Sequence, residues 1–149
     1  MRFSVSVSES GNGPYAEIVR AGRHMVEADE PESLGGRDAG MAPYEYLMAG
    51  LGACTAMTLR AYAARHQWPL GKITVLLHHE KATSPDGKNK IDRFEREILI
   101  PGDLTDGQRA TLLAVAEGCP VSQTLQRPSI VLSQIATDGP SVAAQPDAV

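Results

Sequence analysis

Two cysteines are the residues of this 149-residue chain best suited to chemistry. Cys54 lies within a run of small and apolar residues, Leu51–Leu59, and Cys119 lies between a glycine and a proline. Two cysteines this far apart in a chain without an evident secretory signal favour free or cycling thiols over a permanent disulfide. If the fold brings the two sulfurs together, they can carry out thiol redox chemistry. If it does not, both are buried structural residues.

The two cysteines differ in how a thiolate, the reactive form of the thiol, could be stabilised. Pro120 at the first position of a helical turn places Cys119 at the cap, where free amides and the helix dipole favour an anion. Cys54 in the middle of a helix has no free amides near it, and burial alone would raise its pKa. Cys54 therefore needs a neighbouring cation, and the planar donors of arginine suit that task. The structural alternative is a small apolar filler at Cys54 and a turn residue at Cys119.

Hydrophobic periodicity and turn residues predict an α+β protein with antiparallel sheets. Thr105 and Gln108 form a capping-box pattern at the start of a helix that runs to about Glu117. A single domain is predicted over residues 1–137, followed by a disordered tail over residues 138–149. The remaining predicted elements are strands over 2–8, 15–20, 23–28, 73–82, 91–100 and 130–136, a helix over 43–66, and a helical turn after Cys119.

The predicted helix that contains Cys54 is apolar on nearly every side between Tyr46 and Leu59. This run of about fourteen residues is shorter than the roughly 20 that a bilayer requires, which favours a helix surrounded by protein. Gly50 and Gly52 each cost about 1 kcal/mol of helix stability relative to alanine. Their presence predicts close approach of another backbone, such as a second copy of the same helix.

The charge and composition of the chain argue against several classes of binding partner. The net charge of −4 argues against a nucleic-acid-binding surface. No membrane partner is expected, and the N-terminal residues lack the apolar core of a signal peptide, which predicts a cytoplasmic protein. The four histidines have no close spacing to the cysteines, so neither a metal nor another cofactor is expected.

Two segments, residues 29–59 and residues 119–125, resemble the OsmC/Ohr family of osmotically inducible and organic hydroperoxide resistance proteins, in its OsmC-like branch. The order of the predicted elements agrees, so the resemblance covers about residues 1–137. It implies an intertwined homodimer in which antiparallel sheets wrap around long central helices. It also implies that Cys54 attacks the peroxide oxygen and that Cys119 resolves the product.

The resemblance therefore predicts a cysteine-based peroxidase that reduces organic hydroperoxides to alcohols. Cys54 would become a sulfenic acid and then form a disulfide with Cys119. A dithiol or a lipoylated protein would reduce that disulfide. Two other hypotheses remain open: a non-catalytic dimer that binds a small apolar ligand or serves a stress role, and a thiol redox sensor.

The expected acid and the expected arginine fit the family pattern less well. Characterised branches place a glutamate directly after the proline that opens the helix, where this chain has Tyr44, and Glu45 comes next. Glu45 lies nine residues before Cys54, about 180° away around an ideal helix, so it serves only with an irregular first turn or across a dimer. Otherwise Glu45 is an acid in the first turn of the helix, where its negative charge interacts favourably with the helix dipole. Arg23 is the predicted catalytic arginine, and the other candidates are Arg37 and Arg20.

Overall fold

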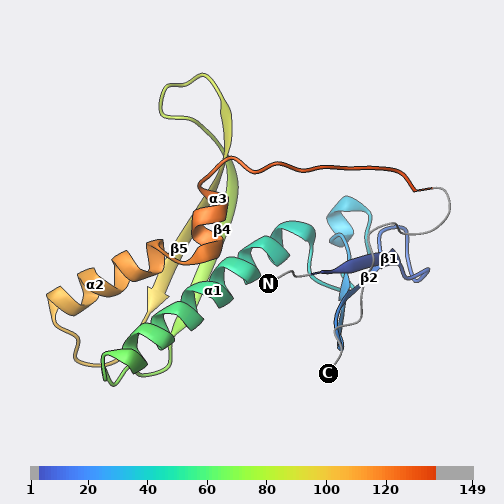
Figure 1. Ribbon diagram of the computed structural model, residues 1–149. Helices are drawn as coiled ribbons and strands as arrows, with labels where there is room; N and C mark the ends of the chain where they lie inside the picture. The colour runs from blue at the N-terminus through green and yellow to red at the C-terminus, as the bar shows by residue number, and fades with distance from the viewer. Residues whose placement is uncertain (1–3, 137–149) are drawn as a thin grey trace. The chain divides into compact units, whose positions relative to one another are not determined.

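The computed structural model describes residues 4–136, and its helices and strands are drawn in Figure 1. The predicted α+β class with antiparallel sheets is confirmed. The described residues fall into two compact units, one formed by residues 4–46 with 131–136 and the other by residues 47–130. The single domain over residues 1–137 stays a prediction, and the predicted tail over residues 138–149 lies outside the described residues. The elements are β1 (Ser6–Glu9), β2 (Glu17–Ala21), β3 (His24–Ala28), the 3-10 turn η1 (Glu32–Leu34), α1 (Pro43–Arg65), β4 (Thr74–Thr83), β5 (Lys90–Leu99), α2 (Asp106–Glu117) and α3 (Pro120–Leu125).

The first unit contains a three-stranded antiparallel sheet in the order β1-β2-β3. Strands β2 and β3 are joined at a two-residue turn in which Gly22 has a φ of 54°, a conformation that glycine adopts without strain. The loop that follows is organised by Asp29, which is almost fully buried. Its carboxylate accepts hydrogen bonds from the backbone amides of Glu30, Arg37 and Ala39.

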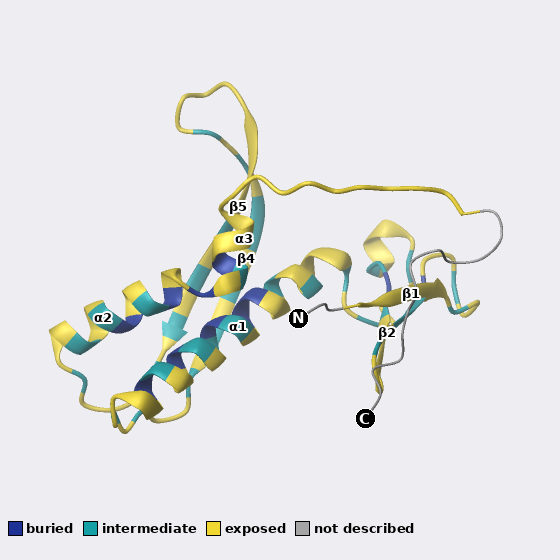
Figure 2. Cartoon of the chain, in the orientation of Figure 1, coloured by how far each residue is buried: buried dark blue, intermediate teal, exposed yellow. Residues whose placement is uncertain are grey.

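The second unit is built on the β4–β5 hairpin, with a core formed by α1 and α2. Leu59 of α1 packs with Leu112 and Ala116 of α2, and all three side chains are buried. Figure 2 shows the buried residues of each helix on one of its sides. The partly buried side chains around this cluster are Tyr62, Trp68, Leu70, Ile73, Ile98, Ile100, Leu104 and Val115.

Helix α1 is buried along one stripe, whose members are Leu51, Gly52, Thr55, Leu59 and Ala63. Its other apolar residues are open in the single chain, since Leu47 is 46% exposed and Met57 is 70% exposed. A single chain therefore does not cover this helix on all sides, and the prediction of a helix surrounded by protein depends on a second molecule. None of the helices in residues 4–136 combines the length and the apolar content needed to cross a membrane.

The two glycines of α1 have different surroundings. A Cβ added at Gly52 would lie 2.8 Å from Cδ1 of Leu77 in β4, so the glycine admits a side chain of the sheet rather than another backbone. A Cβ added at Gly50 would have nothing within 4 Å in this chain. The prediction of close backbone approach is therefore wrong for Gly52, and at Gly50 it depends on a second molecule.

The predicted capping box of α2 is confirmed, whereas the predicted strand after α3 is wrong. The capping box of α2 is present: the Thr105 hydroxyl accepts from the Gln108 amide, and the Gln108 side chain accepts from the Thr105 amide. The predicted strand over residues 130–136 is wrong, because this segment is irregular. Ile130, Leu132 and Ile135 are between 88% and 98% exposed. Among the described residues of the chain, no strand pairs with this segment.

Candidate active site

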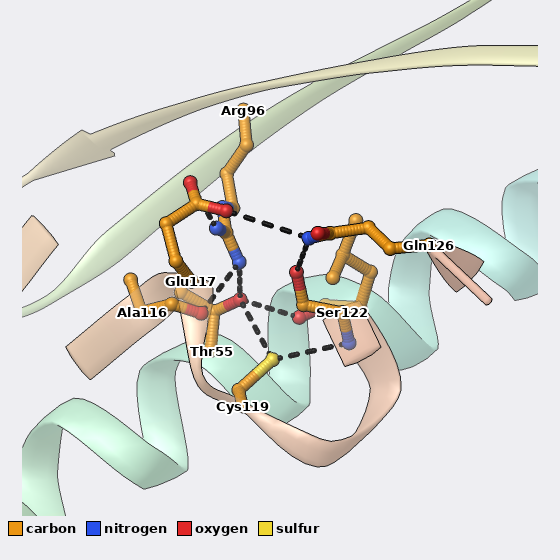
Figure 3. Close-up of polar contacts among 8 residues, drawn as sticks. Thr55, Arg96, Ala116, Glu117, Cys119, Ser122 and Gln126 are labelled. Atoms are coloured by element: carbon orange, nitrogen blue, oxygen red, sulfur yellow. Dashed lines mark hydrogen bonds and ion pairs between the residues drawn. The ribbon is translucent and has the colours of Figure 1, made fainter. Parts of the chain in front are cut away.

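The second unit brings the two cysteines together. Both are free thiols; Cys119 is fully buried and Cys54 is half-buried. Cys119 is the N-cap residue of α3, as predicted, and its Sγ accepts a hydrogen bond from the Ser122 amide at 3.4 Å. The Thr55 hydroxyl oxygen lies 3.8 Å from the same sulfur, and the Cys54 thiol lies close enough to lower the pKa of Cys119. Figure 3 shows Thr55, Ser122 and the Cys119 sulfur converging.

A nearly buried arginine completes this cluster. The side chain of Arg96 in β5 is only 8% exposed. Its Nη1 donates to the Thr55 hydroxyl at 2.7 Å and to the Ala116 carbonyl at 3.2 Å, and its Nη2 forms an ion pair with Glu117 at 3.0 Å. The planar fork of arginine lets one side chain join the middle of α1, strand β5 and the C-terminal end of α2, as Figure 3 shows.

The register of the hairpin determines why Arg96 points at the cluster. Side chains alternate between the two faces of a strand, so Phe94, Arg96 and Ile98 share one face of β5. Arg96 lies opposite Leu77 of β4. Leu77 in turn packs against Gly52 of α1. The small surface at Gly52 thus lets the helix lie close to the sheet, and the next buried residue one turn later, Thr55, meets the guanidinium.

The surroundings of Cys119 favour its charged form. Burial alone would raise the pKa of the Cys119 thiol. Hydrogen bonds from the Ser122 amide, the Thr55 hydroxyl and the Cys54 thiol oppose that effect, as does the positive charge of Arg96. Together they lower the pKa of Cys119 below its ordinary value. Since reactive sulfur is thiolate, the site is arranged to hold an anion on Cys119.

Arg96 and Thr55 are the site residues that the sequence analysis did not select. The available signal was the position of Arg96: it is a charged residue on the otherwise apolar face of an alternating strand, between Phe94 and Ile98. A charge at an inward-facing position requires a buried partner. The sequence could not name that partner, because Thr55 is 41 residues away along the chain.

The predicted acid has a clear local role. Glu45 lies in the first turn of α1, and its carboxylate accepts a hydrogen bond from the Ala42 amide at 2.8 Å. This contact satisfies a backbone donor at the helix start and matches the alternative of a first-turn acid. Its predicted role at Cys54 stays a prediction.

The predicted arginines belong to the first unit. Arg23 is exposed in the turn between β2 and β3. Arg20 lies in β2, and Arg37 donates to the Asn12 carbonyl at 2.6 Å. The predicted action of Arg23 on Cys54 stays a prediction, whereas Arg96 is the arginine that the structure places beside Cys119.

A cavity of about 410 Å³ adjoins the cluster. Its volume is within the range of small-molecule sites. The polar part of its wall comes from Arg96, Glu117 and Ser122 of the cluster and from Asp92, Arg93 and Gln126, and neither cysteine lines it. Its apolar wall is formed by Leu51, Ile91, Phe94, Leu113 and Leu125. Over residues 4–136 no group of three or more histidine, cysteine or acidic side chains is arranged to hold a metal ion.

The family model that describes OsmC-like proteins matches residues 35–133, which include both cysteines and Arg96. The chain belongs to the OsmC-like family. No curated protein sequence matches it. The fold is nevertheless shared with solved OsmC-like structures whose sequence identity to this chain is low.

Three of these structures illustrate the similarity. The organic hydroperoxide resistance protein OsmC of Legionella pneumophila has 21% identity and a TM-score of 0.64, over 85% of this chain and 90% of that one. The OsmC-like protein of Mycoplasma pneumoniae has 18% identity and a TM-score of 0.65, over 85% and 88%. The organic hydroperoxide resistance protein of Elizabethkingia anophelis has 21% identity and a TM-score of 0.62, over 83% and 87%. At these identities the likeness establishes the OsmC-like fold.

Proposed function

We propose that this OsmC-like protein is a thiol-dependent peroxidase that reduces organic hydroperoxides to alcohols. The observation that carries the proposal is the buried site around Cys119, whose hydrogen bonds and neighbouring charge favour an anion there and in which the Cys54 thiol lies close enough to lower the pKa of Cys119. A redox cycle requires two such sulfurs within reach of each other and one of them ionised. The names of the Legionella and Elizabethkingia proteins support the same class of activity.

The exposures of the two cysteines support their roles. Cys54 is half-buried and can meet a substrate, whereas Cys119 is fully buried. The Cys54 thiolate attacks the distal oxygen of the hydroperoxide, the O–O bond breaks, and the alkoxide leaves as alcohol after protonation. Cys54 is then a sulfenic acid. The Cys119 thiolate attacks its sulfur and expels hydroxide, so a disulfide forms.

The cavity beside the cluster supports an organic substrate. Its wall of leucine, isoleucine and phenylalanine side chains would accept the apolar part of a hydroperoxide, which hydrogen peroxide lacks. The resemblance to the family further suggests that a small dithiol or a lipoylated protein restores the two thiols. No metal or organic cofactor takes part in the proposed cycle.

The exposed apolar side of α1 supports a homodimer. Leu47, Met57 and the open surface at Gly50 would be covered by a second copy, in the manner that the family resemblance implies for central helices wrapped by sheets. The dimer is part of the proposal.

A single-turnover measurement tests the activity. The reduced protein is mixed with cumene hydroperoxide in the absence of any reductant, and the released cumyl alcohol is quantified. We expect about one equivalent of alcohol per chain from the wild type and none above background from Cys54→Ser. Equal, slow release by both proteins would exclude the peroxidase and leave ligand binding as the better function.

A further inference from the structure

The buried sulfur of Cys119 has polar neighbours on three sides. The Ser122 amide of α3 lies 3.4 Å away, the Thr55 hydroxyl of α1 lies 3.8 Å away, and Cys54 of α1 contributes its thiol. The charged groups near this sulfur are Arg96 of β5 and the Arg96 partner Glu117 at the end of α2. Two neighbouring thiols in such surroundings can share one proton.

The hydroxyl of Thr55 adapts to either charge state of Cys119. It accepts from Arg96 at 2.7 Å, and it lies 2.7 Å from the Leu51 carbonyl, to which it donates. When Cys119 is a neutral thiol, its S–H can donate to Thr55. When Cys119 is ionised, the single hydroxyl hydrogen can turn from Leu51 to the sulfur, while Arg96 continues to bind the oxygen. Arg96 thus acts on Cys119 through Thr55.

We propose that Cys119 is the base for Cys54 as well as the resolving nucleophile, and that Arg96 and Thr55 are the positioning residues that prepare it for both tasks. This inference rests on the proposed peroxidase function. It assigns to the buried sulfur a part in the first chemical step, before any disulfide forms.

The proton balance of this cycle closes. The Cys119 thiolate takes the Cys54 proton as Cys54 attacks the distal peroxide oxygen. The alkoxide leaves with the bonding electrons of the O–O bond and receives that proton from Cys119, which gives the alcohol. Cys119 is then a thiolate again, attacks the sulfur of the Cys54 sulfenic acid, and displaces hydroxide. One proton therefore serves the two sulfurs in turn.

The pH dependence of the first step tests this role. Cumyl alcohol release in a single turnover is measured by rapid quenching, for the wild type and for Cys119→Ser, between about pH 6 and pH 9.5. An unassisted cysteine with a pKa near 8.5 is only a few per cent thiolate at pH 7. We therefore expect Cys119→Ser to release alcohol about tenfold more slowly at pH 7 and to approach the wild-type rate above about pH 9.

The alternative is that Cys119 only resolves the sulfenic acid. Cys119→Ser would then release its equivalent of alcohol at the wild-type rate at every pH and stop at the sulfenic acid, which would overturn the inference while leaving the peroxidase intact. Absence of alcohol from the wild type would instead refute the proposed function itself. The two failures are therefore distinguishable.

Variants of Thr55 give an independent test that leaves both cysteines in place. Thr55→Val removes the hydroxyl, so we expect slower alcohol release at pH 7 and recovery at high pH, whereas Thr55→Ser keeps the hydroxyl and the wild-type profile. Equal profiles for Thr55→Val and Thr55→Ser would overturn the positioning role, as would a loss of rate that is the same at all pH values.

Discussion

Replacement of Thr55 by valine tests how much the buried polar cluster contributes to stability. Valine keeps the branched shape of threonine and has a similar helix propensity, so no cavity forms and the helix is little affected. The change removes the acceptor that Arg96 Nη1 binds at 2.7 Å, at a position where Thr55 has no solvent exposure. A hydrogen bond to a charged group contributes about 1.5–3 kcal/mol. We expect the free energy of unfolding to fall by about that amount.

Thr111→Val is the matched control. The Thr111 hydroxyl also donates to the carbonyl four residues earlier, Gly107 at 2.8 Å, but this contact is exposed and includes no guanidinium. We expect Thr111→Val to change stability by less than about 0.5 kcal/mol. Thr55 makes the equivalent contact to Leu51 at 2.7 Å, so the difference between the two variants isolates the contribution of Arg96.

Urea unfolding of the reduced proteins, followed by circular dichroism, measures both changes. For a chain of this length, each kcal/mol corresponds to a melting-temperature shift of roughly 2–4 °C, so Thr55→Val should melt about 3–12 °C lower. Equal stability of Thr55→Val and Thr111→Val would show that Arg96 does not depend on the Thr55 hydroxyl. The proposed link from Arg96 to Cys119 would then lose its basis.

Three further predictions concern the cap, the thiol and the exposed helix face. Thr105→Ala removes one side of the capping box and should lower the free energy of unfolding, measured in urea, by about 0.5–2 kcal/mol, whereas Thr105→Ser should lower it much less. Equal losses of stability for the two variants would contradict the capping role of the Thr105 hydroxyl. Because the folded state lowers the pKa of Cys119, ionisation of this thiol adds stability above its ordinary pKa, and that stability is lost as the pH falls through the folded pKa. The stability advantage of the reduced wild type over Cys119→Ser should therefore be larger at about pH 9.5 than at about pH 6, and a constant difference would refute the lowered pKa. Gly50→Trp adds bulk to the open side of α1 and should convert the proposed dimer to a monomer in sedimentation velocity, while an unchanged dimer would place the interface elsewhere.

Most of the fold could be predicted from local patterns. Pro43 and the capping box at Thr105 mark helix starts through backbone chemistry that acts within a few residues. The segment over residues 130–136 shows where this reasoning fails. Alternating apolar residues indicate that one face could be buried, but a strand also needs a neighbour with unpaired backbone groups, and a single sequence does not supply that information.

The site could be predicted only in part. The settings of Cys54 and Cys119, together with the family resemblance, identified both thiols. The predicted arginines lie beside turns and loops in the first 40 residues, whereas Arg96 comes from the middle of a strand. Its partner at position 55 becomes adjacent only when β5 packs under α1, which depends on the contact between Leu77 and Gly52. Long-range packing of this kind leaves no local signature beyond a charge on an apolar face.

The most direct test of the central claim is the identity of the bond that forms during one turnover. The reduced protein receives one equivalent of cumene hydroperoxide and is then digested without reductant for peptide mapping. The account predicts one intramolecular disulfide that joins Cys54 to Cys119, and a protein mass lower by the two thiol hydrogens. A stable sulfenic or sulfinic acid on Cys54, with Cys119 still reduced, would contradict it.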